Sequence, residues 1–408
     1  MTETHQITRL GHHGDGMAQG PNGPLFAART LPGEEVSGDV SGDRILSPRI
    51  VTPSTDRVAA PCRHYKRCGG CNLQHASDAF VADWKAGIVR DTLGRAGIEP
   101  EITGVETSPP NSRRRAALAG LKTKKGAQVG FHVAHGSDVV EIPDCKLLNP
   151  ALIAAIPVLE QITRLAATRG AEVTLHVTNT LTGIDLSIEG AKPFDRQAML
   201  GLASLGQHFA RITWNGEAAL QQTPPHIAMG AARVTPPPGA FLQATEAGQA
   251  ALTARVTDIL KGATRVVDLF AGCGTFTFPV AEFAPVHAVE GDRPLIEALD
   301  QGIRYATGLK AITTEVRDLF RNPILPEDLT KFDAVVIDPP RAGAQAQVEQ
   351  LVNAPSLRTI AFVSCNPGTF ARDAATLRQA GWKMGPVTIV DQFRWSPHVE
   401  LVAAFHRT

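Results

Sequence analysis

Residues 265–276 read RVVDLFAGCGTF, a short apolar run that leads into a loop with glycines at 272 and 274. The run has the length and valine content of a buried strand, and the glycines let the loop backbone come close to a ligand. The third glycine of the G-x-G-x-x-G dinucleotide fingerprint is missing, because Phe276 and Thr277 follow. The loop is therefore a weak match for a nicotinamide dinucleotide.

Strands and helices alternate on either side of this stretch, from about residue 241 to the C-terminus. The helices include 247–261, 293–306 and 369–380, and the strands are RVVDLF, VHAVE, AITTEV, FDAVVID, TIAFVS and VTIVDQF. This alternation predicts an α/β fold with a doubly wound, Rossmann-like sheet that binds ligands at the carboxyl ends of its strands.

One acidic residue at a strand end suits a nucleoside cofactor. Glu290 closes VHAVE, eighteen residues after Gly272, where its carboxylate can accept hydrogen bonds from ribose hydroxyls. S-adenosylmethionine meets this requirement and carries no pyrophosphate. The alternative is that Glu290 merely ends a strand.

Two later strand ends carry groups suited to chemistry. Asp338 opens DPPRAG, where two prolines remove two amide donors and stiffen the turn. D-P-P is frequent in methyltransferases, although Asp-Pro also begins ordinary turns. Cys365 ends TIAFVSC directly before Asn366-Pro367-Gly368, a good start for a helix. We expect the positive end of that helix to lower the thiol pKa and favour a nucleophile, with a buried structural cysteine as the alternative.

The first half of the chain divides into two further segments. Residues 1–58 are short β-rich pieces between glycines, which predict a small barrel of the oligonucleotide-binding kind. Its five Lys and Arg against seven Asp and Glu argue against a strong grip on RNA by this segment alone, and a cap without a ligand is the alternative. Residues 59–240 predict an α+β domain, which ends at the proline-rich linker VTPPPG.

Four of the six cysteines form a candidate metal site. Cys62, Cys68 and Cys71 have the spacing C-x5-C-x2-C, and Cys145 is a plausible distant fourth ligand. An iron-sulfur cluster fits this spacing better than zinc, which normally uses paired short spacings, and coincidence is a third reading. Glycines at 69 and 70 would allow the close backbone approach and amide donors that a cluster favours.

The charge and hydropathy of the chain restrict the kinds of partner that it can bind. Forty Lys and Arg balance forty Asp and Glu, so affinity for a nucleic acid requires a local patch. Residues 61–130 are the candidate, with twelve basic and six acidic residues that include RRR at 113–115 and KTKK at 122–125, and a solvated charged face is the alternative. The helix expected over 77–96 presents Phe80, Val81, Trp84, Ile88 and Leu93 to a core, and the C-terminal domain is a candidate packing partner for it. No signal-like start or membrane-length apolar run is present, so we expect a cytoplasmic protein with no membrane partner.

SCNPGTFARD, DLFAGCGTF, DPPRAG, the cysteine spacing and the closing SPHVELVAAF together resemble the uracil-C5 RNA methyltransferases. The likeness is to their iron-sulfur branch that acts on 23S ribosomal RNA, and TLPGEEV after GPLFAA resembles the RNA-binding TRAM barrel. The resemblance implies that Cys365 is the nucleophile, that Glu400 is the general base and that the four cysteines hold a 4Fe-4S cluster. It implies cofactor contacts from Gln243, Phe270, Thr275, Glu290, Asp318 and Asp338, and RNA contacts from Phe241, Arg113, Arg114 and Arg115.

The chain departs from the family pattern at three places. Threonine stands at 275 and 245 where the family often has asparagine, and Ser112 precedes the arginines where it has tyrosine. These differences bear on cofactor and RNA contacts more than on the reaction.

Several readings stay open at this point. The preferred one is methylation of uracil C5 in structured RNA, expected to be 23S ribosomal RNA, by a monomer. Transfer RNA is the alternative substrate, and a non-catalytic iron-sulfur RNA-binding protein is the alternative of another class. Exocyclic amino methylation fits less well, because Arg341 follows D-P-P where an aromatic residue is expected. Cytosine-C5 methylation would more often show a cysteine directly after the prolines.

Overall fold

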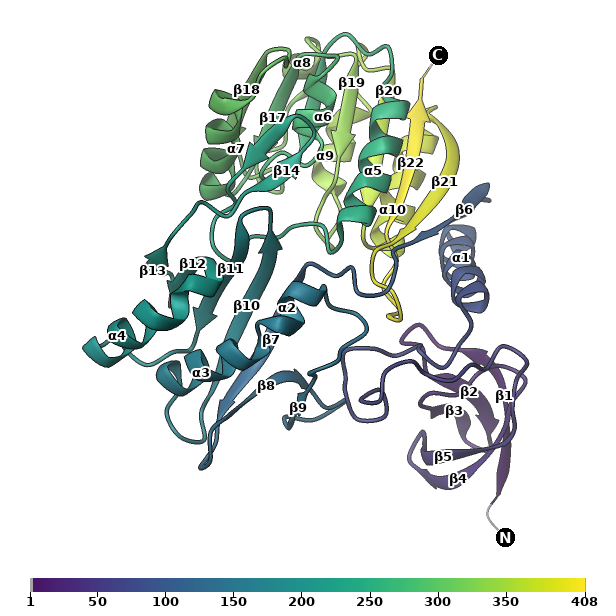
Figure 1. The fold of residues 1–408 in the computed structure, drawn as a ribbon. Helices are drawn as coiled ribbons and strands as arrows, with labels where there is room; N and C mark the ends of the chain where they lie inside the picture. The colour runs from purple at the N-terminus through teal and green to yellow at the C-terminus, as the bar shows by residue number, and fades with distance from the viewer. Residues whose placement is uncertain (1–2, 408) are drawn as a thin grey trace.

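Five short strands near the N-terminus close into a small barrel, at the lower right of Figure 1. The computed structural model describes residues 3–407. Ile7, Ala27 and Val36 fill the barrel interior, as the alternating burial of its strands requires. The barrel expected for residues 1–58 is thus confirmed. In sheet order its strands are β1 (Thr4–Leu10), β2 (Gly16–Gly20), β3 (Gly23–Ala27), β5 (Arg44–Thr52) and β4 (Glu35–Ser41).

A seven-stranded sheet follows, at the lower left of Figure 1. It is covered by α2 (Pro150–Ala154), α3 (Ile156–Ala166) and α4 (Arg196–Leu205). Leu118, Leu159 and Leu175 are buried in the core between helices and sheet. The strands, in sheet order, are β13 (Glu217–Gln221), β12 (Phe209–Trp214), β11 (Gly183–Glu189), β10 (Glu172–Thr180), β7 (Arg115–Lys122), β8 (Ala127–His132) and β9 (Val139–Glu141).

The C-terminal sheet has eight strands and carries the predicted strand-end residues. All of its strands run in one direction except β22, which is antiparallel to both of its neighbours. This confirms the predicted α/β fold with a Rossmann-like sheet. In sheet order the strands are β18 (Ile312–Val316), β17 (Val286–Glu290), β16 (Val266–Leu269), β19 (Ala334–Ile337), β20 (Thr359–Ser364), β22 (Leu401–His406), β21 (Lys383–Asp391) and β6 (Ile102–Thr107).

Helices cover both faces of this sheet, as the unbroken apolar strands require. Val267 and Leu269 of β16 pack into one core, and Val266 packs into the core on the other face. A hairpin of β14 (Ile227–Met229) and β15 (Ala232–Val234) packs beside the second face. The helices are α1 (Asp78–Arg95), α5 (Glu246–Ile259), α6 (Thr277–Ala281), α7 (Arg293–Tyr305), α8 (Pro326–Leu329), α9 (Gln345–Leu351) and α10 (Pro367–Gln379).

The spatial units differ from the expected boundary at residue 240. Helix α1 and strand β6 come from the first quarter of the chain, yet β6 pairs with β21 and α1 packs on the C-terminal sheet (Figure 1). Val81 and Leu93 of α1 are buried as expected, whereas Trp84 and Ile88 are half-buried and line a groove beside β1. Sequence order therefore does not separate the central and C-terminal units.

A buried ion pair joins α1 to the end of β21. Lys85 is fully buried, and its Nζ lies 2.6 Å from Asp391 Oδ1 and 3.4 Å from the Phe393 carbonyl oxygen. Breaking a buried pair leaves one charge uncompensated, so the contact strongly favours this one placement of α1. It fixes the start of residues 391–400, the segment that carries Glu400.

None of the helices in the described part of the chain is both long enough and apolar enough to span a membrane.

Candidate active site

Parallel strands bring the predicted strand-end residues to one edge of the C-terminal sheet. Phe270 follows β16, Glu290 ends β17, Asp338 follows β19 and Cys365 follows β20. Asp318 lies two residues beyond β18. Since carboxyl ends of parallel strands meet at the same edge, residues separated by almost a hundred positions become neighbours there.

The glycine loop after β16 is held in an unusual backbone conformation. Phe270, Gly272 and Gly274 have φ angles of 61°, 56° and 100°, a region that favours glycine. A Cβ on Gly274 would lie 2.6 Å from the Phe278 ring, so no larger residue fits there. The Gly272 N–H donates to Glu290 Oε2 at 3.0 Å. Glu290 therefore ties the glycine loop to the next strand, beyond its position as a strand end.

The remaining predicted cofactor residues flank this loop. Asp318 Oδ1 accepts hydrogen bonds from the backbone N–H groups of Phe320 and Arg321, and the Phe320 ring lies 5.4 Å from that of Phe270. Thr275 is half-buried in the glycine loop itself. Thr245 is buried elsewhere, where its hydroxyl caps α5 by accepting from the Gly248 N–H.

Strand register places Cys365 opposite Glu400. In the antiparallel pair of β20 and β22, the last residue of β20, Ser364, faces the first residue of β22, Leu401, so Cys365 and Glu400 lie at the same end of the pair. Cys365 is half-buried, whereas Glu400 is 3% exposed. A thiol and a carboxylate from residues 35 positions apart thus share one end of the strand pair.

The environment of Cys365 corrects one expectation. The helix that follows begins as predicted, with the Gly368 N–H donating to Asn366 Oδ1 at 3.0 Å. The pKa of the thiol is nevertheless raised, to about 11, because burial and the negative charges of Glu400 and Asp338 outweigh the opposing charge of Arg341. The prediction that the helix start lowers this pKa is wrong, since burial of the thiol, together with the neighbouring carboxylates, raises it.

Two carboxylates beside the thiol are themselves shifted. Burial raises the pKa of Asp338 to about 7. Burial and the charge of Asp338 raise the pKa of Glu400 well above its usual range, while Arg115 opposes this. Because the two carboxylic acids influence each other's charge, they do not ionise independently. One can accept a proton in its ionised form while the other holds a proton in its neutral form.

The three arginines of RRR have different surroundings. The Arg115 guanidinium lies 4.4 Å from the centre of the Phe241 ring, and Phe241 is 63% exposed. Arg113 lies over the Phe393 ring at 5.7 Å. Arg114 is buried and donates to the Gln243 carbonyl oxygen at 3.0 Å and to Gln249 Oε1 at 2.6 Å. Arg114 thus holds the Gln243 segment, and Arg115 with Phe241 forms an accessible cation and ring near Glu400.

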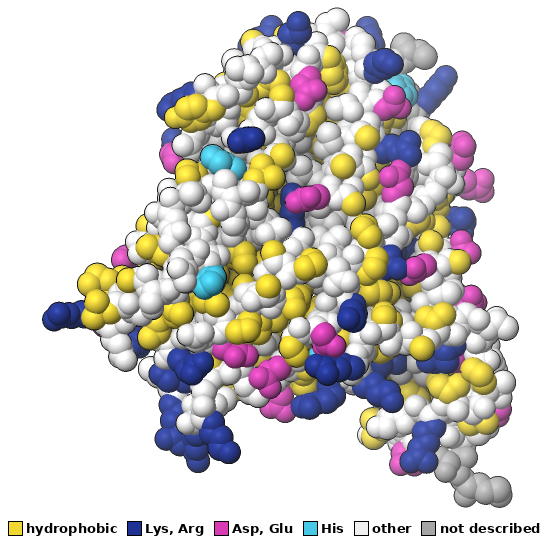
Figure 2. All heavy atoms as spheres, in the orientation of Figure 1, with side chains coloured by type: hydrophobic (Ala, Val, Ile, Leu, Met, Phe, Trp, Pro, Cys, Tyr) yellow, Lys and Arg dark blue, Asp and Glu magenta, His cyan; other side chains and the backbone are white. Residues whose placement is uncertain are grey.

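The basic region expected over residues 61–130 is not one patch. RRR precedes and enters β7, whereas KTKK lies at the other end of this eight-residue strand, about 25 Å away at 3.3 Å per residue. Figure 2 shows Lys and Arg side chains gathered at the lower tip of the central sheet, where β7 turns into β8. RRR therefore lies at the candidate active site, and KTKK lies on a distant surface.

One buried glutamine at this site was not singled out from the sequence. The Nε2 of Gln392 contacts both Glu400 Oε2 and Gln243 Oε1, the latter at 2.5 Å, and its Oε1 accepts from the Ala244 N–H. Its polar side chain directly after the apolar strand VTIVD is the available signal, but its partners lie in two segments, residues 243–244 and residue 400.

The four candidate ligand cysteines lie around one small cavity. Cys62, Cys68, Cys71 and Cys145 line it together with Tyr65, Gly70 and Phe131. All four are free thiols. The N–H of Gly70 donates to Cys68 Sγ and that of Leu147 to Cys145 Sγ, both at 3.4 Å. Among the described residues, no three His, Cys, Asp or Glu side chains converge closely enough to bind a single metal ion.

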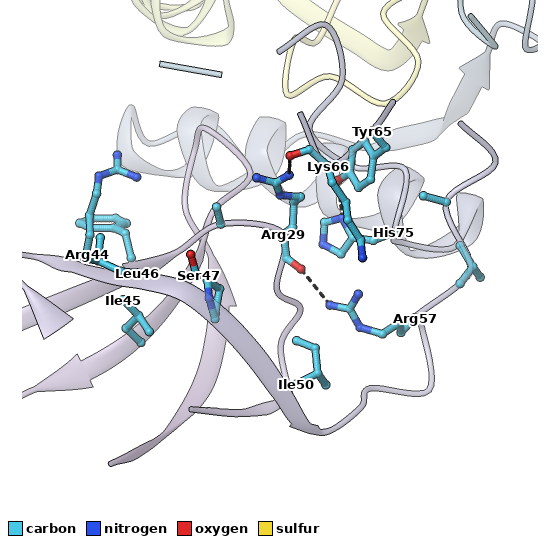
Figure 3. Close-up of a pocket in the computed structure, with 15 residues that line it drawn as sticks. Arg29, Arg44, Ile45, Leu46, Ser47, Ile50, Arg57, Tyr65, Lys66 and His75 are labelled. Atoms are coloured by element: carbon cyan, nitrogen blue, oxygen red, sulfur yellow. Dashed lines mark hydrogen bonds between the residues drawn. The ribbon is translucent and has the colours of Figure 1, made fainter. Parts of the chain in front are cut away.

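A larger hollow lies between the barrel and the cysteine-rich segment (Figure 3). It has a volume of about 680 Å³. Figure 3 shows Arg29, Lys66, Tyr65 and His75 grouped on one side and Arg44 on the other. Of the described residues that line it, four are cations, including Arg57, and none is a carboxylate. Tyr65 also lines the cysteine cavity, so the two sites share a wall.

Comparison with known proteins identifies the family. An RNA methyltransferase of Caulobacter vibrioides is 44% identical over 98% of this chain and 99% of its own length. A 23S rRNA uracil-C5 methyltransferase of Halomonas elongata is 33% identical over 97% of this chain and 87% of its own length. The chain belongs to the uracil-C5 RNA methyltransferases. The model of the tRNA (uracil-5-)-methyltransferase family matches residues 235–407 of this methyltransferase.

The fold of this methyltransferase has a solved counterpart over nearly its whole length. The structure of the Pyrococcus abyssi tRNA (uracil-54, C5)-methyltransferase, in complex with S-adenosyl-L-homocysteine, has a TM-score of 0.74 and 21% identity. It covers 99% of this chain and 100% of its own. Family membership makes the methyltransferase an S-adenosylmethionine-dependent enzyme that methylates uracil C5 in RNA.

Proposed function

We propose that the enzyme methylates a uridine of 23S ribosomal RNA, with Cys365 as nucleophile and Glu400 as general base. The observation that carries the proposal is that this thiol directly follows β20 and this carboxylate directly precedes β22, beside the Ser364–Leu401 pair, where the charge of Glu400 acts on the thiol. The ribosomal substrate is supported by the Halomonas elongata relative, which spans nearly the whole chain.

The chemistry needs both side chains. C5 of uracil is too weak a nucleophile to attack a methyl sulfonium, so the Cys365 sulfur adds to C6 and makes C5 electron-rich. The thiol must lose its proton for this addition. We assign Asp338, a neighbouring carboxylate whose charge acts on the thiol, as the acceptor of that proton, which leaves Glu400 ionised for the later step. S-adenosylmethionine, held by Gln243, Phe270, Thr275, Glu290, Asp318 and Asp338, supplies the electrophilic methyl group.

Glu400 acts after the methyl group has reached C5. It removes the C5 proton, so that the C6–S bond breaks and Cys365 leaves with its electron pair. A raised pKa suits this role, because a carboxylate with a raised pKa is a stronger base.

The base must leave its stack to reach a half-buried thiol. Phe241 is exposed and has the Arg115 guanidinium over its ring. Such a ring can stack on an extruded uracil, and a cation beside it can pair with the developing negative charge on the base. We assign these two residues to the target base, with Arg113 close by and Arg114 supporting Gln243.

The substrate is tested by nucleoside mass spectrometry of 23S ribosomal RNA and transfer RNA from a strain that lacks the gene. Loss of one 5-methyluridine from 23S ribosomal RNA supports the proposal. Transfer RNA is the second candidate, favoured by the family model over residues 235–407, and loss from transfer RNA alone would select it. Unchanged 5-methyluridine in both would contradict the function.

We also propose that Cys62, Cys68, Cys71 and Cys145 hold a 4Fe-4S cluster. Cysteine sulfurs that bind iron-sulfur clusters typically accept hydrogen bonds from backbone N–H groups. Two of the four cysteines, Cys68 and Cys145, accept such bonds. A cluster binds each thiolate through a different iron, so its ligands lie farther apart than those of one zinc ion. That spacing agrees with four thiols that share a cavity without converging on a point.

Anaerobically purified enzyme is expected to contain about four iron and four sulfide per chain, and Cys71→Ser is expected to lose most of both. Cys273→Ser, a buried cysteine outside the cavity, is the control for a general effect of losing a thiol. Colorimetric iron and sulfide analysis with the visible spectrum measures both. Stoichiometric zinc without sulfide would refute the cluster.

The hollow between barrel and cysteine segment is proposed as a contact for the RNA backbone. Lys66 is exposed and Arg44 is about half exposed, with one weak pairing to Asp15 at 3.3 Å. Arg57 is already paired with the buried Glu34. Lys66 and Arg44 are therefore the cations most available to phosphates.

Combined Arg44→Ala and Lys66→Ala substitution is expected to weaken RNA binding several-fold and to lower the slope of log K against log salt by about 0.7 for each cation. Binding of S-adenosylmethionine should stay unchanged. Arg49→Ala, an exposed cation on β5 outside the hollow, is the matched control. Fluorescence anisotropy across a salt series measures the slope, and an equal effect of Arg49→Ala would contradict the site.

A further inference from the structure

Gln392 lies between the proposed base and the proposed cofactor contact. It is 1% exposed and directly follows Asp391, which the buried Lys85 holds in place. Its side-chain Nε2 contacts Glu400 Oε2 and Gln243 Oε1, and its Oε1 contacts the Ala244 N–H. Both Nε2 protons of the amide therefore have acceptors, and Oε1 has one donor.

The orientation of this amide follows from its contacts. An N–H group can only donate, so the Ala244 N–H requires Oε1 of Gln392 to face it. The two Nε2 protons must then point to Glu400 and Gln243. Gln243 in turn accepts through Oε1, which leaves its own Nε2 group free to donate toward the cofactor side.

The side chain of Gln392 packs directly against helix α5. A Cβ on Gly248 of α5 would lie 2.6 Å from Gln392 Cβ, so helix and glutamine can approach only because residue 248 is glycine. The hydroxyl of Thr245 caps α5 at that same residue. Helix α5, the 241–245 segment and the end of β21 thus meet at one side chain.

We infer that Gln392 is a positioning residue that holds Glu400 as an ionised base and couples it to the cofactor contact Gln243. A hydrogen bond donated to a carboxylate stabilises its charged form. Glu400 needs this help, because burial and the charge of Asp338, after β19, disfavour its charged form, while Arg115 on β7 favours it. The Cys365 thiol, after β20, is the other titratable group beside it. The inference rests on the proposed role of Glu400 and adds a residue that the family comparison does not assign.

Gln392→Met is the decisive variant, since methionine fills a similar volume without a donor. We expect kcat to fall about tenfold, as for one lost hydrogen bond to a charged group. The acidic limb of the kcat profile should move up by about one pH unit, because Glu400 then needs a higher pH to ionise. The KM for S-adenosylmethionine should rise, and a covalent complex of enzyme with methylated RNA should accumulate on denaturing gels, because the final proton abstraction is slowed.

Two further variants separate positioning from folding. Gln392→Glu keeps the acceptor for the Ala244 N–H but sets a second acid beside Glu400, so its acidic limb should move further in the same direction. Gln347→Met is the matched control. Gln347 is also fully buried and bonds the Ile324 backbone through both amide atoms, but it lies on α9 away from Glu400. It should lower the melting temperature without moving the pH profile.

Folded Gln392→Met and Gln392→Glu enzymes with the wild-type pH profile and no accumulated complex would overturn the inference. Failure of the wild-type enzyme to methylate any uracil would instead overturn the proposed function. Wild-type activity, measured in the same assay, distinguishes the two outcomes.

Discussion

Cys365→Ala enzyme is expected to show no detectable methyl transfer, a loss of at least about 10⁴-fold. Without the thiol no bond forms to C6, and C5 stays too poor in electrons to accept a methyl group. Transfer of labelled methyl groups from S-adenosylmethionine to 23S ribosomal RNA transcripts measures the loss. The same variant should fail to restore 5-methyluridine in the deletion strain.

This result supports the mechanism only if the substitution removes the nucleophile without unfolding the enzyme or weakening cofactor binding. Cys365 is half-buried and its side chain forms no hydrogen bond with residues 3–407, so alanine should leave the melting temperature and S-adenosylmethionine binding close to wild type. Cys365→Ser adds a second test, because a hydroxyl is a far weaker nucleophile at neutral pH. Residual turnover of either folded variant above a few per cent would rule out a covalent role for Cys365.

Glu400→Gln enzyme is expected to methylate its RNA once and then stop. Cysteine addition and methyl transfer do not require the base, but elimination does, so a methylated covalent complex should persist and turnover should fall by about 10²- to 10⁴-fold. RNA with tritium at C5 of uracil and carbon-labelled methyl donor separates the two steps. Methyl label should enter the complex while tritium is retained.

The isosteric change also has a specific structural control. Glutamine at 400 keeps the volume of a side chain that is 3% exposed and can still accept from Gln392, so folding should be preserved. Tritium release at the wild-type rate from this variant would assign the base to another group. Asp338, whose pKa is raised to about 7 beside the same thiol, is then the next candidate.

Much of this site follows from sequence because of one geometric rule. Glu290, Asp338 and Cys365 each stand at the end of an apolar strand, and parallel strands all end at one edge. Glu400 could be placed only through the resemblance, since nothing in its local pattern shows that β22 runs antiparallel to β20. The register that sets it opposite Cys365 depends on pairing across the intervening helix α10 and strand β21.

Other features depended on tertiary contacts that no local pattern contains. The predicted direction of the Cys365 pKa shift is wrong because a helix start is visible in sequence, whereas the burial of the thiol and the charges of Glu400 and Asp338 depend on three segments brought together by folding. The basic region expected over residues 61–130 is not one patch, because a count of charges along the sequence ignores that the length of β7 separates RRR from KTKK. Gln392 was missed because a buried glutamine differs from an exposed one only by its partners.

The placement of β6 has a consequence for synthesis on the ribosome. Thr103 Oγ1 beside β21 donates to the Val387 carbonyl oxygen at 3.3 Å, across 284 positions of the sequence. The nascent chain therefore exposes α1 and β6 long before their partner strand exists, and contacts of such high order form late. Lys85 meets Asp391 at the end of the same strand, so the outer strand docks and the segment bearing Glu400 is fixed only after β21 has been synthesised. Assembly of the sheet edge and positioning of the candidate base are thereby linked.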